Sequence, residues 1–177
     1  DRGTGLSDQH PKNPTIPNIL GAIYAESGRY KKAIVSYNKA ISLKPDYSDA
    51  HYNLGNALKH VENHIKAITS YNKAIVIKPD HAPSYNNLGI ALNDIGQCED
   101  AIRNYNKTTQ LKPNHAGAYT NLGNALNKLG QHEKAVANFK NTIELNPVNA
   151  DAYNSLGSAL HDLGQYEEAI NNYKKQF

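Results

Sequence analysis

Apolar residues recur at steps of three and four positions in two stretches of residues 82–115, separated by a short polar turn. The first stretch carries Tyr85, Leu88, Ala91, Leu92 and Ile95, and the second carries Ala101, Ile102, Tyr105 and Leu111. This spacing places the apolar side chains on one face of an α-helix, whose period is 3.6 residues. The pattern therefore predicts two amphipathic helices.

The residues at the ends of the two stretches indicate how the helices are connected. Gly96 suits the left-handed residue that closes a helix, because glycine has no Cβ to clash. Pro113 ends the second helix, since proline lacks an amide hydrogen and its ring clashes with the preceding turn. The sequence thus predicts an antiparallel pair. In residues 48–81, Glu62-Asn63 replaces the glycine-containing turn, so Asn63 is a candidate for the left-handed position unless the turn differs.

The same pattern returns every 34 residues. The positions that show the period most clearly are Leu20, Leu54, Leu88, Leu122 and Leu156. A period of this length predicts an all-α solenoid of stacked helix pairs. We expect repeats at 14–47, 48–81, 82–115, 116–149 and 150–177, the last of them truncated. Residues 1–13 show no period and are expected to be flexible.

Small and aromatic residues recur with the same period. Glycines stand in the middle of the first helices, where each costs about 1 kcal/mol relative to alanine: Gly21, Gly55, Gly89, Gly123 and Gly157. Twelve residues later stand Ala33, Ala67, Ala101, Ala135 and Ala169. We expect each glycine to face an alanine methyl, with the aromatic residues of the second helices filling the remaining space. Thr108 and Thr142 replace Ala40 and Ala74 of earlier repeats, which predicts looser contact there.

Leu-Gly, alanine, aromatic and proline positions at this spacing resemble the tetratricopeptide repeat over residues 14–177. The resemblance implies a right-handed superhelix in which the first helix of each pair lines the concave side. Pentatricopeptide RNA-binding proteins have a similar period but lack this combination of residues. The repeats "NLGNAL" look most similar to the repeat region of protein O-GlcNAc transferases, where concave-face asparagines hold the substrate backbone.

Asparagines recur on the face of the first helices opposite the packing residues. The candidate peptide-binding residues are Asn53, Asn87 and Asn121, then Asn56 and Asn124 one turn further on, and Ser155 in the fifth repeat. A carboxamide offers one acceptor and one NH₂ donor, which match the two polar groups of a peptide unit. We therefore expect an asparagine ladder that holds an extended peptide by its backbone. The alternative is that duplication copied the asparagines, which meet only water or a neighbouring helix.

Three interpretations of function follow. The first is a non-catalytic scaffold that binds a protein or peptide segment. The second is the substrate-recruiting region of a larger protein glycosyltransferase, in which case the chain is a fragment of an enzyme. The third is a scaffold that self-assembles into a homo-oligomer through an uncapped end, because Tyr173 and Phe177 lack a following helix. A cationic clamp on a C-terminal carboxylate is disfavoured, since Lys59 and Lys128 are the only cations near the groove.

Composition narrows the classes of partner. The 177 residues carry a net charge of only +3, which does not favour nucleic acid or an anionic membrane. Cys98 is the single cysteine, which excludes an internal disulfide and favours a reducing, cytoplasmic location. The absence of methionine, including at the start, suggests an incomplete N-terminus. His60 and His64 have metal-ligand spacing, but a turn falls between them, so neither a metal nor a cofactor is expected.

Overall fold

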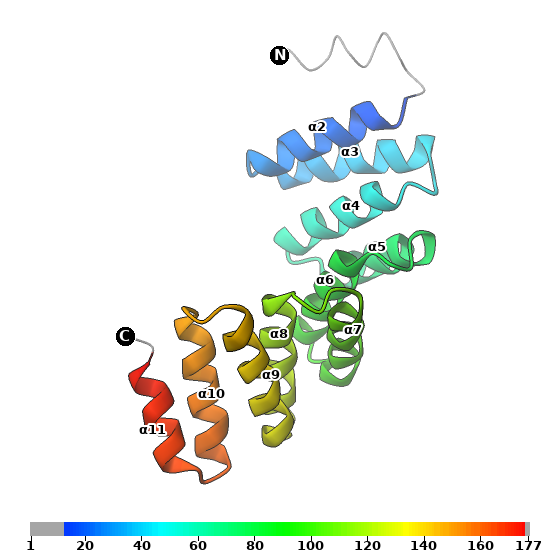
Figure 1. The fold of residues 1–177 in the computed structure, drawn as a ribbon. Helices are drawn as coiled ribbons and strands as arrows, with labels where there is room; N and C mark the ends of the chain where they lie inside the picture. The colour runs from blue at the N-terminus through cyan, green and yellow to red at the C-terminus, as the bar shows by residue number, and fades with distance from the viewer. Residues whose placement is uncertain (1–12, 176–177) are drawn as a thin grey trace. The chain divides into compact units, whose positions relative to one another are not determined.

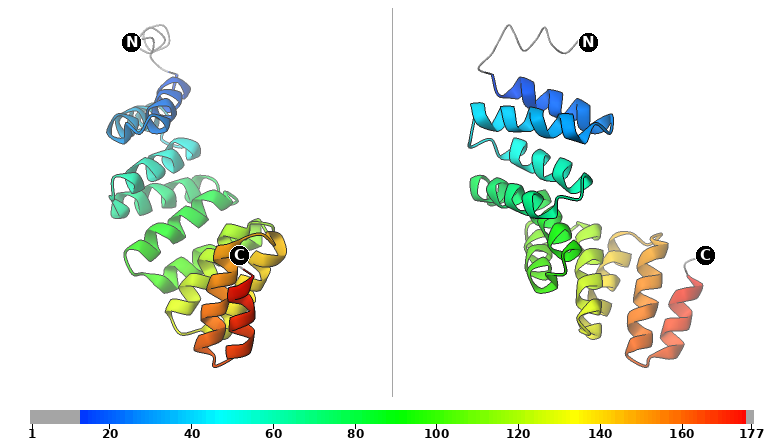
Figure 2. Two further views of the ribbon diagram at one scale, coloured as in Figure 1. Left: turned by 90° about the vertical axis from the view of Figure 1, so that its left-hand side faces the viewer. Right: turned by 180° about the vertical axis from the view of Figure 1, so that it is seen from behind.

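The computed structural model describes residues 13–175, which form ten α-helices and no β-strand (Figures 1 and 2). Their bounds are α2 Thr15–Glu26, α3 Tyr30–Leu43, α4 Ser48–His60, α5 His64–Ile77, α6 Ala82–Asp94, α7 Cys98–Leu111, α8 Ala116–Lys128, α9 His132–Leu145, α10 Ala150–Asp162 and α11 Tyr166–Lys174. Consecutive helices form antiparallel pairs, which confirms the all-α class. Each expected repeat range contains one pair.

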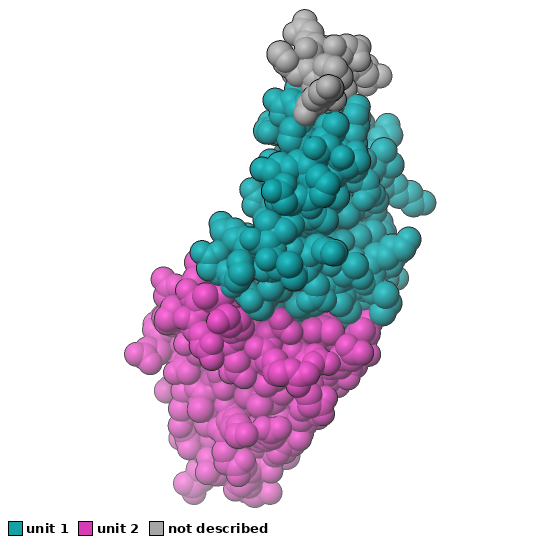
Figure 3. All heavy atoms as spheres, turned by 90° about the vertical axis from the view of Figure 1, so that its right-hand side faces the viewer, with its two compact units in different colours: residues 1–91 teal, residues 92–177 magenta. Residues whose placement is uncertain are grey.

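Two compact units divide the chain, Asp1–Ala91 and Leu92–Phe177 (Figure 3). In unit 1, α3 packs against both α2 and α4, and α4 packs against α5. In unit 2, α9 packs against both α8 and α10, and α10 packs against α11. Residues 1–12, for which flexibility is expected, lie outside the described residues. Phe177, which is expected to be exposed, also lies outside them. None of the described helices has the length and apolar character needed to span a membrane.

The turns within the helix pairs use a left-handed residue at one equivalent position. Glycine occupies it in four pairs, with φ between 72° and 81°: Gly28, Gly96, Gly130 and Gly164. In the second repeat Glu62 takes this conformation with φ 59°. The proposal that Asn63 is left-handed is therefore wrong. Asn63 instead precedes α5, and its side chain accepts a hydrogen bond from the Lys66 amide, satisfying one of the free donors of the first turn.

The core is a row of alanine, leucine and aromatic side chains. Ala33, Ala67 and Ala135 are fully buried, and Tyr71 and Phe139 are at most 1% exposed. Four mid-helix glycines of the first helices face aromatic rings rather than alanines: Gly21, Gly55, Gly123 and Gly157. A Cβ on Gly55 would lie 2.5 Å from the Tyr71 ring, and one on Gly123 would lie 2.6 Å from the Phe139 ring.

This arrangement corrects the expected glycine–alanine contact. The nearest atoms to each of these glycines belong to the residue sixteen positions later, not twelve. The absent side chain makes room for a flat ring, and the ring fills the space between the two helices of a pair.

Threonine does not open the packing where it replaces alanine. Thr108 and Thr142 are fully buried, as are Ala40 and Ala74. The Thr142 hydroxyl donates to the carbonyl oxygen of Asn138 at 3.2 Å. Because its hydroxyl is hydrogen-bonded, Thr142 is accommodated in the core without an unsatisfied polar group. The looser contact expected between neighbouring helix pairs does not appear as solvent exposure of Thr108 or Thr142.

Candidate functional site

The asparagine ladder of unit 1 begins between the first helices α2 and α4. Asn53 on α4 is half-buried, and its Nδ2 donates to Asn18 Oδ1 on α2 at 3.3 Å. Asn18 Nδ2 in turn donates to the Tyr47 hydroxyl at 3.4 Å. The ladder residue therefore bridges two successive repeats through side-chain amides.

A second network surrounds Asn56 and Asn87. Asn56 Oδ1 accepts from the Tyr71 hydroxyl at 2.8 Å and from Asn87 Nδ2 at 2.9 Å. Asn87 Nδ2 also donates to the Tyr52 hydroxyl at 3.3 Å, and Asn87 Oδ1 accepts from Asn86 Nδ2 at 3.2 Å. Burial is the main cause that raises the pKa of Tyr71 well above its usual value, so this hydroxyl remains a donor at neutral pH.

The two networks leave different numbers of polar groups available for a ligand. Asn87 uses both amide hydrogens and an oxygen lone pair within the protein. Asn56 uses only its oxygen, and its NH₂ group has no partner within residues 13–175. Asn53 uses one amide hydrogen, and its oxygen accepts no hydrogen bond from the same residues. Asn53 and Asn56 therefore retain the donors and acceptor that could meet a peptide unit.

Both residues line a cavity of about 320 Å³, here named the α2/α4 cavity. Its other walls are alanine methyl groups of α2 and α4 together with four larger side chains: Glu26, Tyr30, Tyr37 and His60. The rings of Tyr30 and His60 stack with centroids 4.3 Å apart and planes 5° from parallel. One wall is thus aromatic and another carries carboxamides.

Glu26 gives the α2/α4 cavity its electrostatic character. This side chain is exposed, and it forms no ion pair with any residue in the described range. Burial raises the pKa of the Tyr37 hydroxyl, and the charge of Glu26 raises it further. The second effect indicates that the carboxylate acts on the part of the cavity where Tyr37 lies.

In unit 2 the candidate residues lie on α8 and α10. Asn121 and Ser155 are half-buried and Asn124 is exposed. Near the end of α8, Asn127 Oδ1 lies 2.7 Å from His132 Nδ1, and His132 Nδ1 lies 3.8 Å from Asp162 Oδ2. The positions of these residues on first helices are as expected, and whether they bind a ligand stays a prediction.

Comparison with known families identifies the repeat. A model described as TPR repeat matches residues 21–60 and 123–164, and two models described as tetratricopeptide repeat match residues 46–114 and 104–137. The chain belongs to the tetratricopeptide repeat (TPR) family. No match was found among curated proteins.

Solved structures of TPR proteins share the fold. A crystal structure of MamA is 29% identical, with a TM-score of 0.86 and coverage of 89% of this chain and 92% of MamA. YrrB, described as a TPR protein with an unusual peptide-binding site, is 20% identical, with a TM-score of 0.86 and coverage of 99% and 91%. PilF of Pseudomonas aeruginosa is 22% identical, with a TM-score of 0.82 and coverage of 95% and 77%. These likenesses show the TPR solenoid fold.

Sequence reasoning missed the partners of the TPR ladder. Asn18 and Tyr52 hold Asn53 and Asn87, and each partner lies 35 positions before the residue it holds. Equivalent positions of successive repeats are 34 residues apart. The hydrogen bonds between adjacent first helices instead join residues that are 35 positions apart. A polar residue directly before each ladder residue, Tyr52 before Asn53 and Asn86 before Asn87, is the signal that could have identified the contact.

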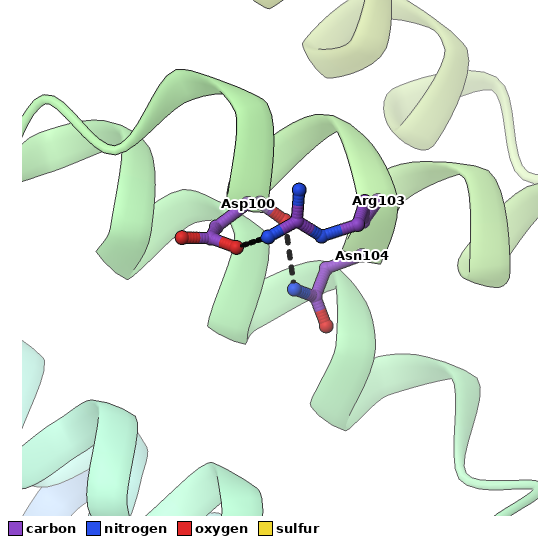
Figure 4. A network of polar contacts seen from close by, with 3 residues as sticks. All are labelled: Asp100, Arg103 and Asn104. Carbon is purple, nitrogen blue, oxygen red and sulfur yellow. Dashed lines mark hydrogen bonds and ion pairs between the residues drawn. The ribbon is translucent and has the colours of Figure 1, made fainter.

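One charged pair on a second helix forms within that helix. On α7, Arg103 forms an ion pair with Asp100, and Asn104 Nδ2 donates to the Asp100 carbonyl oxygen at 2.8 Å (Figure 4). The lysines before the repeat-ending prolines are exposed: Lys44, Lys78 and Lys112. These side chains are therefore solvated.

The other residues singled out in the sequence have structural partners. His60 stacks on Tyr30, whereas His64 lies on α5, so the two histidines belong to different helices. Cys98 is 4% exposed and lies 3.7 Å from Asn93 Oδ1. A buried thiol reacts slowly, which supports an inert role for Cys98.

Proposed function

We propose that this TPR chain binds an extended segment of another protein through the first helices of its repeats, without catalysing a reaction. The observation that carries the proposal is the α2/α4 cavity, whose walls present polar groups of Asn53 and Asn56 that have no partner among the described residues. A carboxamide that donates to a peptide carbonyl and accepts from a peptide N–H recognises the backbone of any sequence. The structural neighbour YrrB, with its unusual peptide-binding site, is consistent with this use of the fold.

The proposal assigns different roles to the asparagines of unit 1. Asn53 and Asn56 contact the ligand, whereas Asn87 holds Asn56 and Tyr52 in position. In unit 2 the proposal extends to Asn121, Asn124 and Ser155, which lie on the corresponding first helices. The proposed ligand is therefore a chain long enough to contact more than one repeat.

The test begins with a phage-displayed library of linear peptides selected on the whole chain. The affinity of a selected synthetic peptide is then measured by fluorescence anisotropy. Asn53→Ala combined with Asn56→Ala removes the open groups without adding a charge, and it also removes the oxygen that accepts from Tyr71 and Asn87, so circular dichroism checks that the variant folds. We expect binding to weaken by about 1–3 kcal/mol, because each neutral hydrogen bond contributes about 0.5–1.5 kcal/mol.

The matched control replaces asparagines on the second helices. Asn72→Ala on α5 and Asn106→Ala on α7 change exposed carboxamides that lie outside the proposed site. They should leave both the affinity and the helical circular dichroism unchanged. Equal affinity of the Asn53/Asn56 variant and the control variants would reject the proposed site.

A further inference from the structure

We propose that the α2/α4 cavity accepts a basic side chain of the bound segment. This inference rests on the proposed binding of an extended segment, and it adds the chemical class of one side chain which that segment carries. The observations behind it are the charge of the cavity, its size and the nature of its walls.

Charge is the first observation. Among the residues that line the α2/α4 cavity, Glu26 carries the only full charge at neutral pH when histidine is neutral, and none is lysine or arginine. Its carboxylate has no ion-pair partner in residues 13–175. Burial is the main cause that raises the pKa of Tyr37, and the charge of Glu26 adds to it, which agrees with a carboxylate close to the inner wall. A cation entering the cavity would supply the missing counter-charge.

Size and wall chemistry are the second observation. A volume of about 320 Å³ lies near the lower limit of small-molecule pockets, which start at about 300 Å³, and suits a single side chain better than a cofactor. Asn53 Oδ1 is an unused acceptor on one wall, and the stacked pair Tyr30–His60 forms another. Guanidinium and ammonium groups donate to such oxygens, and their aliphatic stems pack against aromatic rings.

Variation between repeats is the third observation. Successive repeats place His60, Asp94, Lys128 and Asp162 at the position equivalent to Glu26. A carboxylate therefore recurs at Asp94 and Asp162, but the position is not uniform along the array. The combination of Glu26, the Tyr30–His60 stack and two carboxamides belongs to the first two repeats, so it gives this part of the face a selectivity that the asparagines alone cannot provide.

The experiment compares an arginine with its neutral isostere. Acetylated and amidated octapeptide pools carry arginine or citrulline at one fixed central position, with all other positions varied, and are titrated against the whole chain and against Glu26→Gln. The wild-type chain should bind the arginine pool about fivefold more tightly, the upper range for a partly exposed ion pair. Glu26→Gln should bind both pools equally. Glu133→Gln, at an exposed position of α9, is the matched control and should keep the preference.

The outcomes separate this inference from the proposed function. If both pools bind wild type equally, and binding still depends on Asn53 and Asn56, the side-chain inference is overturned and peptide binding stands. If the arginine preference survives Glu26→Gln, the basic side chain binds elsewhere and the inference is again rejected. If neither pool binds at all, both the function and the inference fall.

Discussion

His81 lies at the corner between the second and third repeats, where its ring is enclosed by polar and aromatic neighbours. Its Nδ1 is 2.7 Å from the Ser84 hydroxyl, and its ring meets the Tyr52 ring edge-on at 5.0 Å. Burial is the main cause that lowers the pKa of His81, and Lys78 adds to it, while Asp49 and Asp80 oppose it. The folded state therefore favours the neutral imidazole.

This shift predicts a loss of stability in acid. The unfolded chain binds the proton near pH 6.5, whereas the folded chain binds it only at lower pH. The contribution of His81 is fully present above about pH 6.5 and is lost as the pH falls through the folded pKa. Urea unfolding at pH 7.5 and pH 5.5 should show a larger loss of unfolding free energy in wild type than in His81→Asn.

Asparagine is the matched replacement because Asn149 occupies the equivalent corner and caps α10 there. An identical pH dependence of the two proteins would show that His81 does not carry the effect. The other histidines remain in both proteins, so the comparison isolates one ring.

Residue-level detail could be predicted only where a local signal exists. Asn63 and Glu62 both stood at a turn, where residue type favoured Asn63 as the left-handed residue but the 34-residue period aligned Glu62 with the turn glycines. The structure gives the cap to Asn63, because a carboxamide accepts the amide hydrogen of Lys66. Glu62 then adopts the left-handed conformation, although a glutamate side chain does not favour it.

At the scale of elements, the helix pair depends on a ring held against a backbone. Gly55 on α4 leaves room for the Tyr71 ring on α5, and Tyr71 is fully buried. Gly55→Ala would gain about 1 kcal/mol of helix propensity but would force a Cβ to 2.5 Å from that ring. Overpacking costs typically 1–3 kcal/mol, so we expect a net loss of up to about 2 kcal/mol in urea unfolding.

Gly117→Ala is the control for this prediction, since it is also a glycine in a first helix. Gly117 is exposed on α8, and a Cβ there would lie 3.4 Å from the nearest atom, a His115 ring carbon. We expect no loss of stability, or a gain of up to about 1 kcal/mol. If Gly55→Ala and Gly117→Ala change the free energy of unfolding equally, the contact with the Tyr71 ring is not the reason for glycine at position 55.

Helix pairs were predictable because each one carries its own signals: an apolar period, a turn and a proline. Their internal contacts were less so. A mid-helix glycine indicates a close approach, but alanine twelve residues on and aromatic sixteen residues on both lie on the partner helix. Only the geometry of the helix pair shows that the aromatic ring occupies the space left by the glycine.

The candidate site was predictable to a similar depth. The ladder could be placed on one face of the first helices, because the spacing of residues within a single helix determines which face they share. The hydrogen bonds of Asn53 and Asn87 depend on the offset between neighbouring first helices, and a single sequence does not reveal that offset. The separation into open and occupied carboxamides therefore emerged only from the structure.

At the scale of the whole chain, TPR stability is expected to behave as a sum of repeat and neighbour terms. In unit 1, α4 packs against both α3 and α5. In unit 2, α11 packs against α10 and is otherwise joined to α9 by the ion pair of Glu168 with Lys140, and its Tyr166 and Ile170 are 59% and 52% exposed. Local opening should therefore be easier in α11 than in α4.

Hydrogen exchange followed by mass spectrometry on the whole chain tests this expectation. Amides of α11 should exchange faster than those of α4. Gly157→Ala sharpens the test, because a Cβ at Gly157 would lie 2.7 Å from the Tyr173 ring of α11. Overpacking this pair should speed exchange in α10 and α11 by about tenfold, for a local cost near 1.4 kcal/mol. Exchange in α4 and α5 should not change, because neighbour terms confine the disturbance. A uniform rise in all helices would instead mean that the chain opens as one cooperative unit, and the description by separate repeats would be wrong.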